Sequence, residues 1–193
     1  MNPMDDTTAA TPPQPSSRVF PTPGSNLYRI LFDPAFKQSF HDRLKTYNPF
    51  IVALYRVGLL PLFGAGRSIM LLTTKGRKSG KDRHFPVGYF RIGGALYVFS
   101  AWGKAAGWYK NLVAYPNDVR LQLGMRKSAV RAQVLEDPAE KQRTLEQLIA
   151  ESPQAANNLF GWQPGRDSLE HADFSPLIQQ VVIVRFSEES QGK

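Results

Sequence analysis

Residues Thr73 to Arg83 read Thr-Thr-Lys-Gly-Arg-Lys-Ser-Gly-Lys-Asp-Arg. The stretch lies between two strand-like runs, Ile69 to Leu72 and Phe85 to Ile92, and holds two glycines, five cations and one acid. Glycine lets a backbone turn tightly, and successive N–H groups in such a turn can form an anion-binding nest. Basic side chains add charge-assisted donors that suit phosphate or carboxylate. The stretch therefore predicts a hairpin loop that binds an anion, or a solvated loop that is basic by chance; the spacing of a Walker A loop is absent.

Composition limits the classes of protein to consider. The chain has 193 residues, 42% of them hydrophobic, and a formal net charge of +8. This length suits one domain with a real core, and the charge suits an anionic partner such as a phosphorylated cofactor, a membrane surface or nucleic acid. Cysteine is absent and the three histidines are scattered. Disulfides and thiolate metal sites are thereby excluded, and we expect no metal site.

Shifts in composition divide the chain into four parts. Residues 1–26 are rich in Pro, Thr, Ser and Ala and lack a basic stretch followed by an apolar one. We therefore expect a disordered tail there and no secretory signal. Residues 27–66 form a helical N-terminal segment, residues 67–187 a β-barrel domain, and residues 188–193 a polar tail.

The helical segment has an apolar second half. Leu27 to Lys45 shows helical spacing, and Asn48-Pro49 is typical of the start of a second helix. Thr46 to Gly66 carries one charge, Arg56, and prolines and glycines interrupt it. It can be a core helix followed by an apolar loop. It can also be an amphipathic element that lies on a membrane surface or covers an apolar substrate pocket.

Strand patterns follow one another with short turns from residue 68 onward. They occur at Ser68 to Thr74, Arg83 to Ile92, Ala95 to Ala101, Asp118 to Leu123, Ser128 to Leu135 and Gln180 to Phe186. We predict helices at Ala105 to Ala114 and from Asp137 to Pro153, and irregular structure over Ala155 to Ser175. Strands joined by hairpins favour an antiparallel sheet closed or half-closed into a small barrel.

Several motifs in a fixed order resemble a known family. After the basic loop come Pro86-Val87-Gly88-Tyr89, then Gly93-Gly94, then Trp108-Tyr109-Lys110-Asn111-Leu112. Together they resemble the deazaflavin-dependent nitroreductase family, whose members use coenzyme F420, an 8-hydroxy-5-deazaflavin. The resemblance covers roughly residues 70–134 and the last strand. It implies an α+β, mainly β fold: a split β-barrel of the FMN-binding type, with about six antiparallel strands and flanking helices.

The resemblance also implies an activity and a site. The protein would be an F420H2-dependent oxidoreductase that passes a hydride to an electron-poor apolar substrate such as a quinone, enone or nitroaromatic, with FMN as the alternative cofactor. The implied substrate residues are Trp102, Phe160 and Trp162. The implied cofactor-binding residues are Arg77, Lys78, Ser79, Arg83, Pro86, Val87, Ser100, Ala101, Trp102, Gly103, Trp108, Tyr109 and Asn111.

The chain departs from the family pattern at three places. The segment between Ser100 and Trp108 looks short and carries an extra aromatic residue, Trp102. Asp82 stands where the family commonly has proline, and it adds negative charge beside the expected phosphate site. Ala155 to Ser175 contains no tyrosine, although family members often carry tyrosines over the substrate. No catalytic residue is therefore assigned; His84 can be a general acid or an ordinary strand residue.

Other classes of function remain as rivals. A split barrel can bind flavin, heme or a fatty acid without turnover. A nucleic-acid binder is disfavoured because the cations cluster in one glycine loop and do not form a stripe with exposed aromatics. We expect a small-molecule substrate, no nucleic-acid partner, and a monomer or homodimer. We place the protein in the cytoplasm, with peripheral contact at the inner membrane face as an open alternative.

Overall fold

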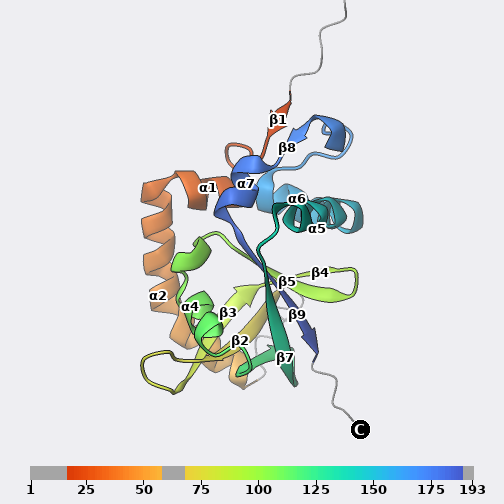
Figure 1. Cartoon of the computed structure of the whole chain (residues 1–193). Helices are drawn as coiled ribbons and strands as arrows, with labels where there is room; N and C mark the ends of the chain where they lie inside the picture. Colours follow the sequence, from red (N-terminus) through yellow and green to blue (C-terminus); the bar gives the residue numbers. More distant parts are fainter. Residues whose placement is uncertain (1–16, 58–67, 189–193) are drawn as a thin grey trace, which may run out of the picture.

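A seven-stranded antiparallel sheet lies at the centre of the molecule (Figure 1). The computed structural model describes residues 17–57 and 68–188. The order of strands across the sheet is β3-β2-β6-β7-β9-β5-β4. These strands are β2 (Ile69–Lys75), β3 (Asp82–Gly88), β4 (Phe90–Ile92), β5 (Ala95–Ser100), β6 (Val119–Leu123), β7 (Arg126–Leu135) and β9 (Val182–Glu188).

The sheet curls because β3 and β4 are its two opposite edges. Only Tyr89 separates them in the chain, so the edges must approach each other there. The sequence predicted a single strand from Arg83 to Ile92, which is wrong, and this division accounts for the seventh strand of the sheet. The predicted fold itself, a split barrel of antiparallel strands with flanking helices, is confirmed.

The interior of the barrel is an apolar core. Side chains alternate between the two faces of a strand, so Met70, Leu72 and Thr74 of β2 all point inward. The inner face is completed by residues of the neighbouring strands and of α4 (Gly107–Ala114), among them Val98, Leu112, Leu121, Val184 and Phe186.

A second core lies on the outer face of β5 and β9, under the helices. These helices are α1 (Asn26–Phe32), α5 (Pro138–Glu151), α6 (Pro153–Phe160) and α7 (Ser175–Gln180). Asp137 caps α5 by accepting from the amides of Ala139 and Glu140. The helix α6 occupies a stretch that the sequence predicted to be irregular, so that prediction is wrong.

The chain is ordered further toward its N-terminus than the sequence predicted. Arg18–Val19 forms β1, which pairs in parallel with β8 (Ala172–Asp173), and Phe20 is fully buried in the second core. The predicted disorder of residues 1–26 is therefore wrong for its last residues, and residues 1–16 lie outside the described part.

A long helix, α2 (Pro34–Arg56), runs beside the barrel (Figure 1). It continues through Pro49, so the predicted helix start at Asn48-Pro49 is wrong. Tyr55 fixes its C-terminal end: the phenol donates to the Ile69 carbonyl at 3.0 Å and accepts from the Gly124 amide at 3.2 Å. Among the described helices, none combines the length and hydropathy of a membrane span. The apolar stretch beyond Val57 lies outside the described residues.

Candidate functional site

The loop between β2 and β3 is a tight turn closed by its own backbone. The Gly76 amide donates to the Lys81 carbonyl at 2.8 Å. The Gly76 carbonyl accepts from the amides of Ser79 at 3.1 Å and Gly80 at 2.7 Å. Gly80 has a φ of +65°, a left-handed conformation that glycine adopts without the strain of a side chain. The glycines therefore serve the turn itself.

This turn is not the anion nest that the sequence predicted. Besides the internal bonds of Gly76, Ser79 and Gly80, the Arg77 amide donates to Asn111 Oδ1 at 3.3 Å, and the Lys81 amide donates to Ser79 Oγ at 3.4 Å. Most of the loop's N–H donors are thus used within the protein. An anion at this loop must be bound mainly by side chains.

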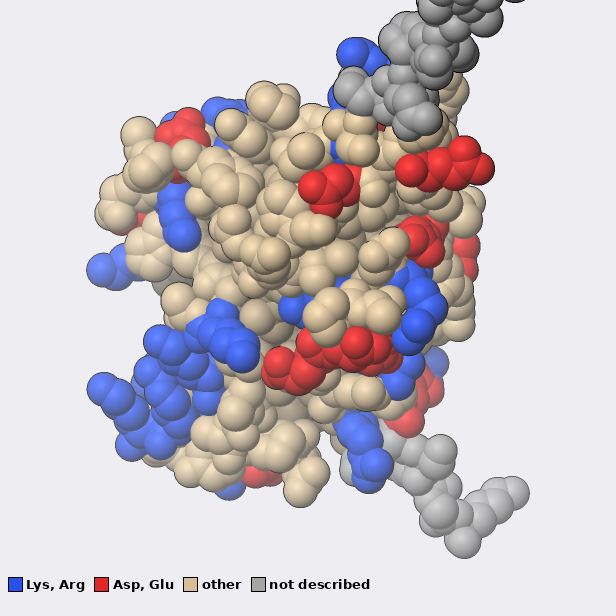
Figure 2. Space-filling view, turned by 45° about the horizontal axis from the view of Figure 1, so that its top comes forward, with Lys and Arg blue, Asp and Glu red and all other residues tan. Residues whose placement is uncertain are grey.

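Four cations project from the loop, and we call Arg77, Lys78, Lys81 and Arg83 the basic loop. All four are exposed, and within the described residues no carboxylate lies within 4.0 Å of any of them. Figure 2 shows Lys and Arg side chains gathered at the lower left of the molecule, the side on which Figure 1 draws this loop. Unpaired cations held together on one turn attract an anion with several charges.

The acid of the loop does not oppose this charge. Asp82 is the strand partner of Lys75 and Arg83 the partner of Thr74, so their side chains lie on opposite faces of the sheet. Asp82 forms an ion pair with Arg120 on the outer face. Arg83 lies on the inner face, opposite Thr74. The negative charge expected beside the phosphate site is thus turned away and neutralised.

Asn111 of α4 joins the loop to the barrel. Its Oδ1 accepts from the Arg77 amide at 3.3 Å and from Arg77 Nη1 at 3.4 Å. Its Nδ2 donates to Thr74 Oγ1 at 3.4 Å. Asn111 is 5% exposed and Thr74 0%. Thr74 was missed by the sequence analysis; its position on the inner face of β2, next to the loop, is the feature that could have indicated it.

Further predicted residues lie in the connection from β5 to α4. Ser100 and Ala101 are buried, and Ser100 Oγ donates to the Gly103 carbonyl at 3.4 Å. Gly103 begins a short turn, η2 (Gly103–Ala105), with a φ of +53°. Trp102 stacks on Phe40 of α2, with ring centroids 5.6 Å apart. This connection therefore brings α2 against the turn that leads to α4.

The remaining predicted cofactor residues do not all face one side. On β3, Val87 points into the barrel and Pro86 lies on the opposite face, because strand residues alternate. On α4, Tyr109 is buried in the barrel core. Trp108 is half-buried and meets the Tyr109 ring edge-on at 6.3 Å. Of the predicted cofactor residues, α4 therefore contributes Trp108 and Asn111 to the side of the molecule where the loop contributes Arg77.

Two predicted substrate residues lie elsewhere. Phe160 is 0% exposed and Trp162 4% exposed, both in the second core. Trp162 lies against Phe20 at 5.5 Å and Phe174 at 6.3 Å, and Phe160 meets the same two rings edge-on. The structure does not bring them to the basic loop, and buried rings offer no face to a substrate.

His84 lies on the outer face of β3, away from the barrel interior. Its Nδ1 is 3.0 Å from Thr73 Oγ1, the residue opposite it on β2. Burial, followed by the positive charge of Arg56, lowers the pKa of His84 below its ordinary value. Since Arg83 and His84 lie on opposite faces, His84 is placed as a strand residue and not as a proton donor at the basic loop.

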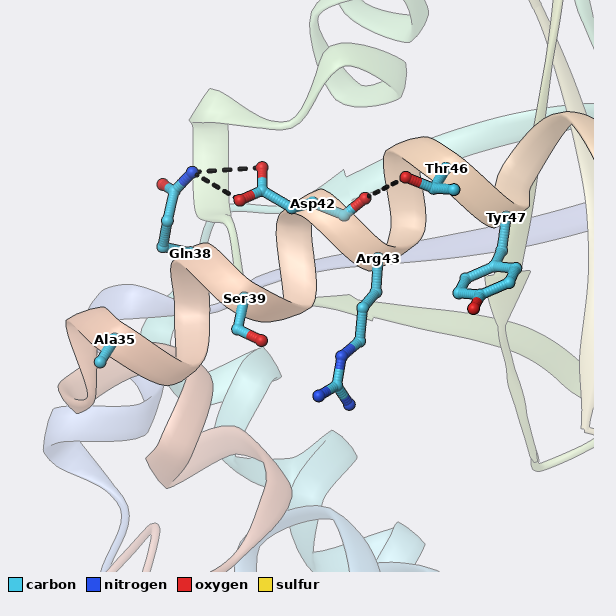
Figure 3. A pocket seen from close by; sticks show the side chains of 7 residues that line it. All are labelled: Ala35, Gln38, Ser39, Asp42, Arg43, Thr46 and Tyr47. Carbon is cyan, nitrogen blue, oxygen red and sulfur yellow. Dashed lines mark hydrogen bonds between the residues drawn. The ribbon is translucent and has the colours of Figure 1, made fainter.

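A separate open hollow of about 640 Å³ follows α2 (Figure 3). In the close view, Gln38 reaches Asp42, with its Nε2 3.1 and 3.2 Å from the two carboxylate oxygens. The hollow is lined by residues of α2 alone: Ala35, Gln38, Ser39, Asp42, Arg43, Thr46 and Tyr47. None of these was predicted as a site residue. A hollow walled by one helix lacks the convergent groups of a binding site, so the basic loop is the stronger candidate.

Comparison with known families decides the identity. The family model described as F420H(2)-dependent quinone reductase matches residues 58–159, more than half of the chain. The chain belongs to this family. The match spans the basic loop, Trp108 and Asn111, and it confirms the resemblance seen in the sequence. As a member of this family, the protein is an F420-dependent oxidoreductase.

Solved structures give partial similarities. One is an F420-H2 dependent reductase, 26% identical, covering 62% of this chain and 94% of that chain with a TM-score of 0.40. Another, described as a domain-swapped dimer, is 23% identical and covers 63% and 81%, with a TM-score of 0.41. A putative pyridoxamine 5'-phosphate oxidase from Listeria innocua is 17% identical and covers 67% and 91%, with a TM-score of 0.41. The comparison with curated proteins gives no match.

Proposed function

We propose that the protein transfers a hydride from reduced coenzyme F420 to an electron-poor, apolar small molecule such as a quinone, and that the basic loop binds the anionic tail of the coenzyme. The observation that carries the proposal is a set of four cations on a turn tied to α4, none of which has a carboxylate within 4.0 Å in the part of the chain that the structure describes. A tail with phosphate and carboxylate groups fits such a donor set. Enones and nitroaromatics remain further candidates for the substrate.

The chain's residues have three tasks in this reaction. The bound deazaflavin supplies the hydride, which is the difficult part of the chemistry. Arg77, Lys78 and Arg83 hold the tail, and Ser79 lies on the same turn. Trp108 offers a half-buried aromatic surface that excludes water and can pack against a flat molecule. Trp102, stacked on α2, is the substrate residue that we retain.

The loop favours coenzyme F420 over FMN. FMN presents one phosphate to the four cations. The tail of coenzyme F420 presents carboxylates in addition to its phosphate, so it can pair with more of these cations. The test is a fluorescence titration of the purified protein with oxidised coenzyme F420, and a parallel titration with FMN. Tighter binding of coenzyme F420 supports the proposal, and equal or tighter binding of FMN contradicts it.

Substitutions in the loop test the tail assignment. Arg77→Ala and Lys78→Ala should each weaken coenzyme binding about tenfold or more, the loss typical of a contact to a charged group. Arg43→Ala is the matched control, because it removes the same charge from the hollow on α2. If Arg43→Ala weakens binding and the loop variants do not, the tail lies along α2 and the assignment is wrong.

A non-catalytic carrier of flavin, heme or fatty acid is the rival. It would bind without turnover. Oxidation of reduced coenzyme F420 by the protein in the presence of menadione distinguishes the two. No catalysed oxidation with any of a quinone, an enone or a nitroaromatic would favour the carrier.

We propose peripheral membrane contact through α2 and the residue that follows it: Tyr47 and Phe50 are 59% and 64% exposed, and Val57 is 67% exposed. Analytical ultracentrifugation decides between monomer and homodimer.

A further inference from the structure

Asn111 was expected to touch the cofactor, but its side chain is already occupied. Both ends of the amide have protein partners, Arg77 at Oδ1 and Thr74 at Nδ2, and the side chain is buried. We propose that Asn111 is a positioning residue that sets the Arg77 guanidinium for an anion, and that it does not itself bind the cofactor. This inference rests on the proposed function of the basic loop.

The neutral amide suits this task. A guanidinium carries five N–H donors, and its hydrogen bond from Nη1 to Asn111 leaves the others for an anion. A carboxylate at this position would hold Arg77 more strongly but would neutralise the charge that attracts the tail. Asn111 thus fixes the arginine without reducing its charge.

Thr74 extends the support into the barrel. The amide of an asparagine can turn over, which would present Nδ2 to Arg77 and repel its donors. The Arg77 amide and Nη1 both donate to Oδ1, which selects this orientation, and Nδ2 on the other side donates to Thr74 Oγ1. Thr74 is fully buried on the inner face of β2, so the arginine is connected to a rigid wall. A long side chain that is already oriented loses less freedom when it binds an anion.

The test is a double-mutant cycle on the affinity for oxidised coenzyme F420, measured by fluorescence titration. Asn111→Ala in the wild-type protein should weaken binding about tenfold, comparable to one charge-assisted contact. In the Arg77→Ala protein the same change should weaken binding less than about twofold, because the guanidinium that Asn111 positions is absent and only the bond to the backbone amide remains. An equal loss in both proteins overturns the inference, since Asn111 would then act on the cofactor directly or through the fold.

Two further variants keep the result clear if Asn111→Ala does not fold. Thr74→Val has nearly the same shape, and its loss of affinity should also vanish in the Arg77→Ala protein. Asn111→Asp should weaken binding more than Thr74→Val, because the new carboxylate neutralises Arg77; wild-type affinity in Asn111→Asp overturns the inference. Asn117→Ala, an exposed asparagine in the turn after α4, is the control and should bind as wild type.

The double-mutant cycle distinguishes a failure of the tail assignment from a failure of the positioning role of Asn111. If Arg77→Ala and Lys78→Ala both bind as wild type, the tail assignment fails. If they bind weakly and the Asn111 and Thr74 variants bind as wild type, only the positioning role fails. Thermal unfolding without ligand, followed by circular dichroism, shows whether each variant is folded.

Discussion

Gly76 is the residue around which the basic loop packs most closely. A Cβ added there would lie 2.8 Å from Ser79 Oγ, 3.1 Å from the Lys81 carbonyl oxygen and 3.3 Å from Arg83 Cγ. At Gly80 the space is open, and only the positive φ opposes a side chain. The two glycines of one loop are therefore required for different reasons.

Gly76→Ala and Gly80→Ala should differ in their effect on the cofactor. Gly80→Ala should cost about 1–2 kcal/mol of stability through its left-handed conformation, with little loss of affinity. Gly76→Ala should cost about 1–3 kcal/mol and also weaken coenzyme binding, because Lys81 and Arg83 must move. Urea unfolding and fluorescence titration measure both effects. A Gly76→Ala protein with wild-type affinity would show that the loop adjusts without moving its cations.

His84 should make stability depend on pH. Burial and the charges of Arg56, Arg120 and Lys127 lower its pKa in the folded state, while Asp82 raises it in part. The unfolded chain keeps the ordinary value of about 6.5 and binds the proton more readily as the pH falls. Stability should therefore be full above this value and decrease as the pH falls from about 6.5 through the lower folded pKa.

His84→Gln should reduce this loss of stability. Urea unfolding at several pH values between 7.5 and 5 measures it, with His41→Gln, an exposed histidine of α2, as the control. A wild-type slope in the His84→Gln protein would assign the loss of stability to another group.

At the scale of elements, α6 and the turn after it build a core and not a substrate wall. Trp162, Phe160, Phe20 and Phe174 pack around one another, and the Trp162 carbonyl accepts from Asn157 Nδ2 at 2.7 Å. The resemblance placed Phe160 and Trp162 over a substrate because family members often carry aromatic tyrosines there, near the C-terminus. The partner that buries them, Phe20, is far away in the chain, in a segment predicted to be disordered.

Trp162→Ala should therefore lower the free energy of unfolding and leave the catalytic activity of the folded protein unchanged. Truncating a buried tryptophan costs about 3–5 kcal/mol. Trp108→Ala is the matched change at a half-buried ring, and it should weaken coenzyme or substrate binding with a smaller loss of stability. Thermal unfolding and steady-state assays with reduced coenzyme F420 and menadione compare the two. A Trp162→Ala protein that is as stable as wild type but has a raised KM would restore its predicted substrate role.

The parts of the site that the sequence predicts are local ones. Charge and glycine content predict the basic loop, and strand alternation explains why Asp82 leaves it. The contacts that position it are not local: Asn111 and Thr74 are 37 positions apart. A period of two also cannot show that the chain leaves one edge of the sheet at Gly88 and enters the other at Phe90. Likewise, Asn48-Pro49 resembles a helix start, yet α2 continues because Tyr55 and the Phe40–Trp102 stack hold both halves against the barrel.

At the scale of the whole molecule, charge and apolar surface act together on α2. Tyr47 and Phe50 lie three residues apart on one face of α2, Val57 follows its last residue, and all three side chains are mostly exposed. The chain has a net charge of +8, so an anionic surface attracts it at long range. Apolar side chains on one helical face can then enter the interface between lipid headgroups and acyl chains.

The double variant Phe50→Ser/Val57→Ser should therefore lose most of the protein's binding to vesicles that contain an anionic lipid. Each buried apolar side chain contributes about 1.5–3 kcal/mol, so the double variant should partition at least about tenfold less. Leu169→Ser is the control, since it removes an exposed apolar residue from another element, the short turn η3 (Leu169–His171). Co-sedimentation at low and high salt measures the effect, and salt should weaken the wild type because it screens the charge. Equal sedimentation of both variants would exclude α2 as the contact, and sedimentation independent of lipid charge would exclude the electrostatic part.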